Sequence, residues 1–411
     1  MSISSLAARY RADFPILAQT VNGSPLVYLD NAASTQRPEV VIEEISRYYR
    51  EDHANVHRGL HTLSTRATAG YEAARERVAR FLSAPSAESV VFTRGTTEAI
   101  NLVATVWGLS TLRPGDVILL TELEHHANLI PWQVVAAKTG ARLHFLPIKD
   151  ETGEIDWADL EKLTHSLPVR LIALTHISNS LGCINPINEV TRIARREGIV
   201  TLIDAAQSAG HCPLNVVEID CDFLVFSGHK CCAPTGIGVL YARPGLLDDL
   251  PPYQTGGEMI VSVTYEGAQW KPLPHRLEAG TPAIAEAFGL AKALEYLDDV
   301  GRVAIAENDH EFGQHAAEAL REIPTVRVFG PKGERAGIVS FQVGSIHPHD
   351  LVAFADQFGV AMRGGHHCTQ PLMHRLGVKG TARASFYFYN EPSEVTDLVK
   401  VVHAARKYFG D

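Results

Sequence analysis

The sequence predicts an α/β protein with two parts, a large domain built on a mostly parallel sheet and a smaller α+β C-terminal domain. From residue 26 to about residue 241, short β-branched apolar runs alternate with longer amphipathic segments, as in sheets whose strands are buried on both faces and joined by crossover helices. After about residue 283 the pattern changes to a long helical stretch and then short strands. The length of 411 residues is enough for two or three domains.

The strands and helices expected in the first part alternate along the chain. The predicted strands are residues 90–92, 117–120, 171–174, 200–203, 223–226 and 238–241. The predicted helices are residues 69–82, 97–107, 129–138, 157–163 and 189–196. Because ligands of such sheets bind beyond the carboxyl ends of the strands, the residues that follow each apolar run are the candidates for a site.

The smaller domain is predicted from the change of pattern near the Gly280-Thr281-Pro282 turn. Its expected elements are a long helical stretch over 283–320, strands at 326–329 and 338–343, a helix from His349, short strands flanking Arg363 and Arg383, and a terminal helix over 392–408. The predicted boundaries are an N-terminal arm over 1–20 that packs with the small domain, a large domain over 21–283 and a small domain over 284–411.

Composition and charge exclude several classes of protein. Hydrophobic residues make up 45% and charged residues 20%, a globular balance, and no apolar run approaches the ~18 residues of a membrane helix. The net charge of −10 disfavours nucleic acid or an anionic membrane as the main partner. Six cysteines without a CxxC pair, and Arg9, Arg11 and Asp13 where a signal peptide would be apolar, predict a reducing cytoplasmic location.

Two predicted strands end in charged groups that are costly to bury. Lys230 follows Ser227, Gly228 and His229 after one strand, and with an ordinary pKa of ~10.4 it needs desolvation or imine formation to free its nitrogen. Asp204 follows another strand and needs a specific cation there, such as a protonated pyridine nitrogen. A solvent-facing lysine, and a helix-capping or metal-binding aspartate, are the alternatives.

Two further strands lead into polar residues at the same predicted edge. Residues 92–101 run from a strand through Gly95, Thr96 and Thr97 into a helix, which is how backbone N–H groups are gathered around a phosphate, although the same residues could be an ordinary helix cap. His125 follows the strand at 117–120 and could stack on a planar ring or move protons, or lie in a polar loop. A phosphate cradle, a carboxylate, an imidazole and a lysine together are what pyridoxal phosphate requires.

The second domain contributes a candidate nucleophilic cysteine. Cys368 lies in the sequence Arg363-Gly-Gly-His-His-Cys-Thr-Gln-Pro371, where neighbouring histidines and Arg363 could raise its reactivity above that of a thiol with an ordinary pKa of ~8.5. Arg383 offers a planar fork suited to a substrate carboxylate. A buried, inert cysteine is the alternative.

These residues resemble those of the class V aminotransferase-like pyridoxal phosphate enzymes, and among them the type II (SufS-like) cysteine desulfurases. The resemblance extends over essentially the whole chain. Its motifs are Tyr28-Leu-Asp-Asn-Ala-Ala33, Asn55-Val-His57-Arg58-Gly59, Thr93-Arg-Gly-Thr-Thr-Glu98, Glu124-His-His-Ala-Asn128, Ser178-Asn179, Asp204-Ala-Ala-Gln207, Ser227-Gly-His-Lys230, Pro234-Thr-Gly-Ile-Gly238, Glu278-Ala-Gly-Thr-Pro282 and residues 363–371.

The resemblance implies a homodimer of pyridoxal phosphate fold-type I and a role for each site residue. Lys230 would hold the cofactor as an imine, Asp204 would pair with the pyridine nitrogen, His125 would stack on the ring and Gln207 would bond the phenolic oxygen. The other implied contacts are Thr96, Thr97, Ser227 and His229 to the phosphate with the partner subunit's Thr281, and Asn179, Arg363 and Arg383 to the substrate.

The implied reaction converts L-cysteine to L-alanine and leaves the sulfur on Cys368 as a persulfide. Lys230 would take the Cα proton and His125 would donate a proton. The persulfide would pass to an acceptor such as a SufE- or SufU-like protein, for iron–sulfur cluster assembly or sulfur trafficking, because the Arg-x-Gly-His-His-Cys loop resembles the short loop of type II enzymes. L-Selenocysteine and cysteine sulfinate are further substrates that the resemblance allows.

Other interpretations remain open at this stage. The chain could be a related pyridoxal phosphate lyase or epimerase in which Cys368 is incidental, a selenocysteine lyase, a silent scaffold, or a metal-binding protein that uses His53, His57 and His61 at i, i+4, i+8 helical spacing. One departure stands out, since Cys231-Cys232-Ala-Pro234 replaces the usual Leu-Tyr-Gly-Pro of the family. We expect these two cysteines to be reduced, small hydrophobic residues.

Overall fold

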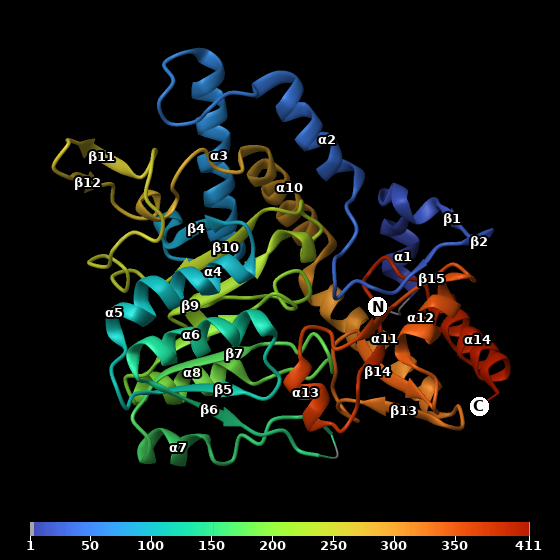
Figure 1. Ribbon diagram of the computed structural model, residues 1–411. Coiled ribbons are helices and arrows are strands. Elements are labelled where there is room, and N and C mark those ends of the chain that lie inside the picture. Colours follow the sequence, from blue (N-terminus) through green and yellow to red (C-terminus); the bar gives the residue numbers. More distant parts are fainter. Residues whose placement is uncertain (1–3, 151, 411) are drawn as a thin grey trace.

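A seven-stranded sheet forms the centre of the larger part of the molecule (Figure 1). The computed structural model describes residues 4–150 and 152–410. The strand order is β4-β10-β9-β8-β7-β5-β6, and β10 is antiparallel to both of its neighbours while the other adjacent pairs are parallel. The strands are β4 (Val90–Thr93), β5 (Val117–Thr121), β6 (Arg142–Leu146), β7 (Val169–Thr175), β8 (Val200–Asp204), β9 (Phe223–Ser227) and β10 (Gly238–Ala242). The predicted mostly parallel sheet is confirmed.

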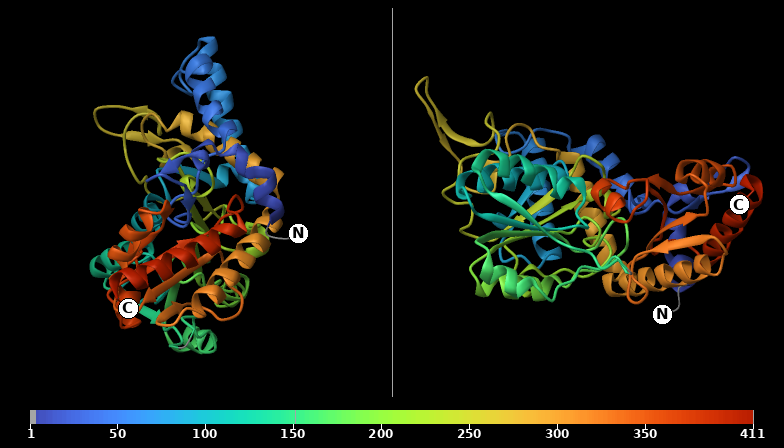
Figure 2. Two further views of the ribbon diagram at one scale, coloured as in Figure 1. Left: turned by 90° about the vertical axis from the view of Figure 1, so that its right-hand side faces the viewer. Right: turned by 60° about the horizontal axis from the view of Figure 1, so that its bottom comes forward.

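Helices cover both faces of this sheet because its strands are apolar on both sides (Figure 2). On β9, Leu224 and Phe226 join the core with the helices α3 (Thr62–Phe81) and α8 (Ile187–Arg196), whereas Phe223 and Val225 join the core with α4 (Thr96–Val103) and α6 (Ile130–Thr139). The remaining helices of this part are α2 (Glu39–Arg47), α5 (Leu109–Thr111), α7 (Leu160–Ser166) and α9 (Val216–Ile219).

The sequence missed β6 and misjudged the long helical stretch. β6 lies at the edge of the sheet, so its residues Arg142, His144 and Phe145 are not fully buried and do not form an apolar run. The stretch after residue 283 is two helices, α10 (Ile284–Val300) and α11 (Arg302–Arg321), because Gly301 between them has φ 96° and ends the first helix.

The C-terminal part is a four-stranded antiparallel sheet with helices packed on it. Its strand order is β13-β14-β17-β16, with β13 (Val326–Phe329), β14 (Ile338–Val343), β16 (Arg363–Gly365) and β17 (Thr381–Ser385). Phe312 of α11, Phe341 of β14 and Leu398 of the terminal helix share one core. The other helices are α12 (Pro348–Asp356), α13 (Gln370–Arg375) and α14 (Pro392–Phe409).

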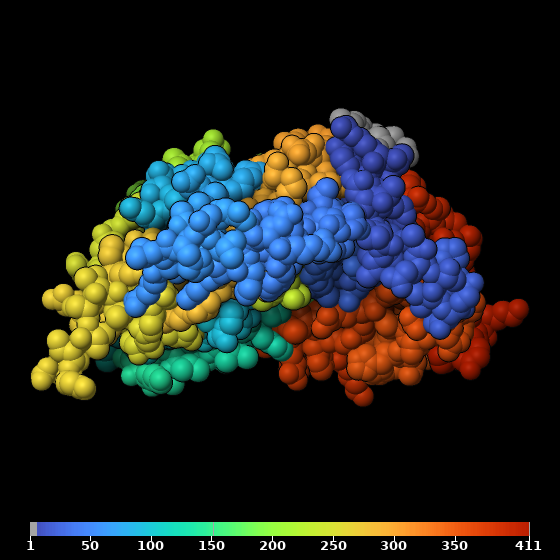
Figure 3. Space-filling model, turned by 90° about the horizontal axis from the view of Figure 1, so that it is seen from above, coloured from blue at the N-terminus to red at the C-terminus, as the bar shows by residue number. Residues whose placement is uncertain are grey.

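The N-terminal segment lies along the C-terminal part of the chain (Figure 3). After α1 (Ser4–Tyr10), Arg11 forms an ion pair with Glu394 at 3.0 Å, and the ring of Phe14 packs 4.5 Å from that of Tyr389. The short strands β1 (Thr20–Val21) and β2 (Ser24–Pro25) pair with each other, and β3 (Val27–Tyr28) pairs in parallel with β15 (Val360–Ala361). The two terminal segments therefore pack together, while α10 packs against α2 and α3 of the other part.

A β-hairpin projects from the body of the molecule on the far side from the termini (Figure 2). It consists of β11 (Ile260–Val263) and β12 (Ala268–Trp270), and Val261, Val263 and Tyr265 are exposed on it.

Among the described residues, the structure has no helix of the length and apolar character that a membrane span requires.

Candidate active site

A cavity of about 210 Å³ opens where β8 and β9 end and the C-terminal part meets them. Every site residue proposed from the sequence lines this cavity except Thr281. They are Thr96, Thr97, His125, Asn179, Asp204, Gln207, Ser227, His229, Lys230, Arg363, Cys368 and Arg383. Residues far apart in the sequence thus share one wall, as expected for the carboxyl edge of a parallel sheet.

Asp204 and Lys230 lie near each other because Asp204 ends β8 and Lys230 follows the end of the neighbouring parallel strand β9. Asp204 pairs with Val225 in the register of β8 and β9, and Lys230 closes the 3₁₀ turn that follows β9. Burial raises the pKa of the Asp204 carboxyl above its ordinary value. Burial also lowers the pKa of Lys230 to about 8, while the nearby Asp204 opposes this shift and Arg383 adds to it. The amine is therefore closer to neutrality than an ordinary lysine.

The N-terminus of α4 and the end of β9 form a cradle of small polar groups. The Thr96 N–H donates to Ser227 Oγ at 2.8 Å, and the two hydroxyl oxygens lie 2.7 Å apart. Gly238 on β10 permits this arrangement, because a Cβ there would lie 2.4 Å from Gly95 Cα. Backbone N–H groups at the first turn of a helix, next to hydroxyls, favour an anion such as phosphate.

His125 is a neutral imidazole on the wall of the cavity. Burial lowers its pKa to about 3, and the neighbouring Lys230 adds to the shift. Its Nδ1 accepts a hydrogen bond from the Ala127 N–H at 3.0 Å, so the ring proton is on Nε2. The side chain therefore has one N–H to donate.

The Cys368 loop is held in a left-handed turn by residues of the larger part. His367 and Cys368 have φ values of 53° and 58°. The His126 N–H donates to the Cys368 carbonyl at 2.8 Å, and Asn179 Nδ2 donates to the His367 carbonyl at 2.7 Å. Cys368 itself is exposed, and its backbone conformation is one that non-glycine residues adopt mainly when the surroundings impose it.

Two arginines of the C-terminal part line the cavity in different ways. Arg383 is buried, donates to the Asn179 carbonyl at 2.8 Å and to Asp30 Oδ1 at 3.0 Å, and has no hydrogen-bond partner for its Nε among the described residues. Arg363 is exposed at the opening. A guanidinium with a free N–H in a cavity is suited to bind a carboxylate.

The polar groups of the cavity fit the pyridoxal phosphate that the sequence predicts. Within the described residues, the Asp204 carboxylate accepts one hydrogen bond, from the Ala206 N–H, and the buried Gln207 Oε1 accepts none. A buried, underbonded carboxylate requires a cation or a donor, which a protonated pyridine nitrogen supplies. The anion cradle, this carboxylate and the Lys230 amine lie on one cavity wall, as the phosphate, ring nitrogen and aldehyde of one small cofactor require.

Two sequence-based expectations lie outside the cavity. Thr281 is exposed and lines another hollow beside Tyr71 and Phe92. Residues 53–61 are not helical, so the alternative in which His53, His57 and His61 form one metal-binding helical face does not hold, and the positive φ of 70° at His57 shows why their spacing does not align them.

Cys231 and Cys232 are fully buried free thiols, as expected from the sequence. Burial raises the pKa of the Cys231 thiol well above its ordinary value and that of Cys232 to about 12. Both are therefore protonated, unreactive groups that directly follow Lys230 in the chain.

Sequence reasoning missed several residues that shape the site. His126 and His367 each belong to a histidine doublet, but only the fold shows that they hold the Cys368 loop, His367 through a 2.8 Å hydrogen bond between its Nε2 and Thr381 Oγ1. Asp30, the partner of Arg383, lies within a motif that the sequence analysis noted. Glu124 is buried, which raises its pKa to about 8, and it links the loop before His125 to β7 through the Thr175 N–H.

The comparisons with known proteins agree with this geometry. The family described as "Aminotransferase class-V" matches residues 27–398. The chain is 50% identical to a probable cysteine desulfurase of Halalkalibacterium halodurans over 97% of both chains, and 49% identical to one of Synechocystis sp. over 100% of this chain and 98% of the relative. It is also similar to two solved structures of cysteine desulfurases. The apo enzyme of Thermococcus onnurineus has 41% identity and a TM-score of 0.92, and the match covers 97% of this chain and 98% of that one. An S-sulfonic acid form of the enzyme from Escherichia coli has 39% identity and a TM-score of 0.87, and the match covers 98% of each chain.

Proposed function

The chain belongs to the class-V aminotransferase family, and from that premise we propose that it is a pyridoxal-phosphate-dependent cysteine desulfurase. In this proposal it converts L-cysteine to L-alanine and holds the removed sulfur on Cys368 as a persulfide. Curated relatives that match nearly the whole chain at 46–50% identity carry the name cysteine desulfurase.

One observation carries the proposal. Cys368 lines both the inner cavity of about 210 Å³, which contains Lys230, and a separate outer hollow of about 720 Å³. A thiol at the boundary of two hollows can take sulfur from a substrate on one side and give it to an acceptor on the other. A buried structural cysteine such as Cys221 lines neither of them.

The lining of the cavity supports an assignment of the residues that would hold the cofactor. Lys230 would form the covalent attachment, Asp204 would pair with the ring nitrogen, His125 would contact the ring, and Gln207 would bond the phenolic oxygen. Thr96, Thr97, Ser227 and His229 would bind the phosphate. When bound, pyridoxal phosphate supplies an electron sink for the charge left at the substrate Cα.

The chain's own groups then bind and orient the substrate. Arg383 and Asn179 hold the cysteine carboxylate, and Arg363 adds positive charge at the opening. Lys230, whose pKa is lowered to about 8 mainly by burial, would remove the Cα proton through its Nζ once the substrate amine has displaced it from the covalent attachment. His125 donates a proton from Nε2.

The sulfur transfer needs no oxidant other than the substrate itself. The Cys368 thiol gives up its proton and its sulfur attacks the substrate sulfur, so that the substrate Cβ–S bond breaks as the new S–S bond forms. The substrate Cβ receives a proton, which gives L-alanine and the Cys368 persulfide. The left-handed turn keeps the thiol at the cavity, since Asn179 binds the carbonyl of His367 and His126 binds the carbonyl of Cys368.

Delivery of the persulfide and assembly of the dimer are parts of the same proposal. The outer hollow is rich in histidine, with His126, His347, His349, His366 and His374 on its wall, and it is large enough to receive a chain segment of an acceptor protein of the SufE or SufU kind. Thr281 is exposed and lies outside the cavity of its own chain, as expected if it contacts the phosphate in the site of a partner subunit. A cytoplasmic location accords with the free thiols.

The test is a paired assay of both products. The holoenzyme is incubated with L-cysteine and a thiol reductant, and alanine and sulfide are quantified together for the native chain, Cys368→Ala and the matched control Cys221→Ala. We expect equal amounts of the two products, lost in Cys368→Ala and retained in Cys221→Ala. No turnover of cysteine by the native holoenzyme would refute the activity, and a fully active Cys368→Ala would refute the role of Cys368.

A further inference from the structure

A group of metal-ligating side chains lies outside the active site, between the start of α3 and the segment after β12. His57 lies in the loop before α3, Glu72 on α3, and His275 in the turn that follows the hairpin, and these segments lie side by side in Figure 1. One ligand atom from each residue can be chosen such that all three lie within 4.8 Å of one another. His57 Nε2 and Glu72 Oε1 are 2.8 Å apart, and the two imidazole rings have centroids 5.1 Å apart.

Three features of this group are compatible with a bound ion. The side chain of His275 makes no hydrogen bond among the described residues, although it is half-buried. Glu258 Oε2 is buried and accepts no hydrogen bond within the described part of the chain; it lies 3.9 Å from His57 Nδ1 and 4.0 Å from Lys271 Nζ, while Glu258 Oε1 pairs with Arg58 Nε at 3.2 Å. His57 and Glu258 both have left-handed backbones, with φ of 70° and 65°, a conformation that is uncommon for non-glycine residues.

We propose that His57, Glu72 and His275 bind one divalent transition-metal ion, with zinc the best match, through two imidazole nitrogens and one carboxylate oxygen. Two histidines and one glutamate are a donor set that zinc takes with its fourth position open to water. Tetrahedral bonds of about 2.0–2.1 Å put ligand atoms about 3.3 Å apart, so the unbonded His275 ring moves inward by about 1.5 Å at most.

The surroundings supply the second contacts that such a site uses. Glu258 faces the far nitrogen of His57, where it would hold the Nδ1 proton and leave Nε2 for the metal. Arg75 Nε bonds Glu72 Oε2 at 2.9 Å, which leaves Oε1 toward His57. The Arg75 charge is in turn balanced by Glu278, through a pair of hydrogen bonds at 2.6 and 2.9 Å. The bound ion would tie α3 to the segment that leads to Thr281.

The test measures zinc binding by the full-length holoenzyme in a Cys368→Ala background, which removes the exposed thiol as a competing ligand. After chelator treatment, zinc is titrated against a chromophoric chelator, and the bound metal is examined by X-ray absorption. We expect one zinc ion per chain with nitrogen and oxygen ligands only. His275→Gln and Glu72→Gln each remove a direct ligand and should weaken binding by at least the about 10- to 100-fold that loss of an outer-shell partner costs.

The control is His53→Gln, which changes a neighbouring histidine outside the group and should leave the affinity unchanged. Because the His275 side chain makes no hydrogen bond among the described residues, His275→Gln is expected to fold, which circular dichroism checks, so the result does not depend on Glu72→Gln. Absence of saturable one-to-one binding, binding unaltered by His275→Gln, or a sulfur ligand in the absorption spectrum would each overturn the proposal.

Discussion

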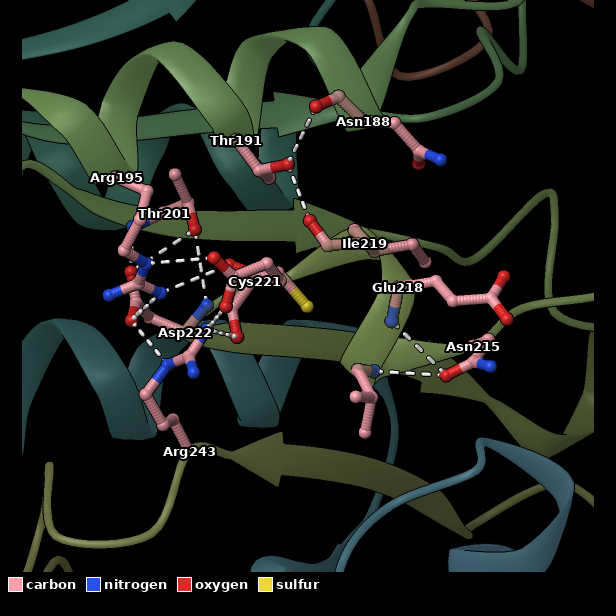
Figure 4. Close-up of polar contacts among 12 residues, drawn as sticks. Asn188, Thr191, Arg195, Thr201, Asn215, Glu218, Ile219, Cys221, Asp222 and Arg243 are labelled. Carbon is pink, nitrogen blue, oxygen red and sulfur yellow. Dashed lines mark hydrogen bonds and ion pairs between the residues drawn. The ribbon is translucent and has the colours of Figure 1, made fainter.

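Two aspartates at opposite ends of neighbouring strands are equally buried but differ in the number of hydrogen bonds that they accept. Asp204 ends β8 and Asp222 precedes β9, and each of these residues is 3% exposed. Asp222 accepts four hydrogen bonds, from Arg195 Nη2 and Arg243 Nε at 2.9 Å each and from the N–H and hydroxyl of Thr201 (Figure 4). Asp204 accepts one within the described residues.

The contrast separates a structural carboxylate from a functional one. The amino-end cluster in Figure 4 is satisfied internally, since Thr191 bonds the Asn188 and Ile219 carbonyls and Asn215 caps α9. Such a network stabilises the fold and leaves no bonding capacity for a ligand. At the carboxyl end, the Asp204 carboxylate accepts one hydrogen bond within the described residues and Gln207 Oε1 accepts none, beside a cavity, which costs stability unless a cofactor completes them.

The largest expected effect comes from removing the amine of the cavity. Lys230→Ala should lower cysteine turnover by about 10³-fold or more, because it removes both the attachment point and the base at the substrate Cα. Mass spectrometry after borohydride reduction should find cofactor covalently bound to the native chain and absent from the variant. Attachment at another lysine in Lys230→Ala would contradict the assignment.

Asp204→Asn should separate activity from stability. We expect turnover to fall by about 10²-fold, because a neutral amide no longer holds the proton on the ring nitrogen. The free energy of unfolding of the cofactor-free protein, measured in denaturant, should not fall, because the single hydrogen bond from Ala206 can be kept by the Asn oxygen. A substantial loss of stability would mean that Asp204 is a structural group like Asp222.

Asp222→Asn should lower the stability of the fold and leave turnover nearly unchanged. Replacing one carboxylate oxygen by an amide group places N–H donors against donors of Arg195, Arg243 or Thr201, so the free energy of unfolding should fall by about 1–3 kcal/mol. Turnover below the unfolding transition should stay within about twofold of the native value. A drop in turnover comparable with that of Asp204→Asn would break the distinction between the two ends of the sheet.

The smallest effect at neutral pH, which grows on acidification, is a change of pH dependence on the cavity side. Burial lowers the pKa of His367 to about 2, against an ordinary value near 6.5, so its neutral form contributes stability above pH 6.5 that is lost as the pH falls toward the folded value. His367→Asn, which suits the left-handed backbone, has no such group. Between pH 6 and 4 the native cofactor-free chain should lose up to about 1.4 kcal/mol per pH unit more than the variant, as denaturant titrations at each pH can measure. Parallel pH profiles would show that His367 is not neutral in the fold.

Much of the sheet could be predicted from the sequence because its signals are local. The runs at 200–203 and 223–226 are β8 and β9 within one residue, since a strand buried on both faces is apolar at nearly every position. Strands β13 and β14 match their predicted bounds. The edge strand β6 and the break at Gly301 were missed because partial burial and a single left-handed residue leave little pattern.

The candidate site was also largely predictable, but through its motifs. Lys230, Asp204, His125 and Cys368 were singled out because each follows an apolar run or stands among charged residues, and the structure brings them to one cavity. The roles of His126, Asp30 and Glu124 could not be predicted in this way, because they depend on which distant groups these side chains and backbones bond. The grouping of His57 with Glu72 and His275 could not be predicted either, because it joins segments that are distant in the sequence.

The sequence by itself determined most of the order of strands and helices, the family, and the kinds of chemical group at the strand ends, because hydrophobic periodicity and motif spacing are properties of short segments. Only the tertiary structure decided which buried carboxylate is satisfied and which is not. Asp222 is completed by arginines from α8 and from the end of β10, whereas no such partner reaches Asp204 within the described residues. Whether a buried group finds its hydrogen-bond partners depends on groups that are close in space but distant in sequence. For this reason the amino-end edge of the sheet is stabilised internally, whereas the carboxyl-end edge keeps free groups that can bind a cofactor.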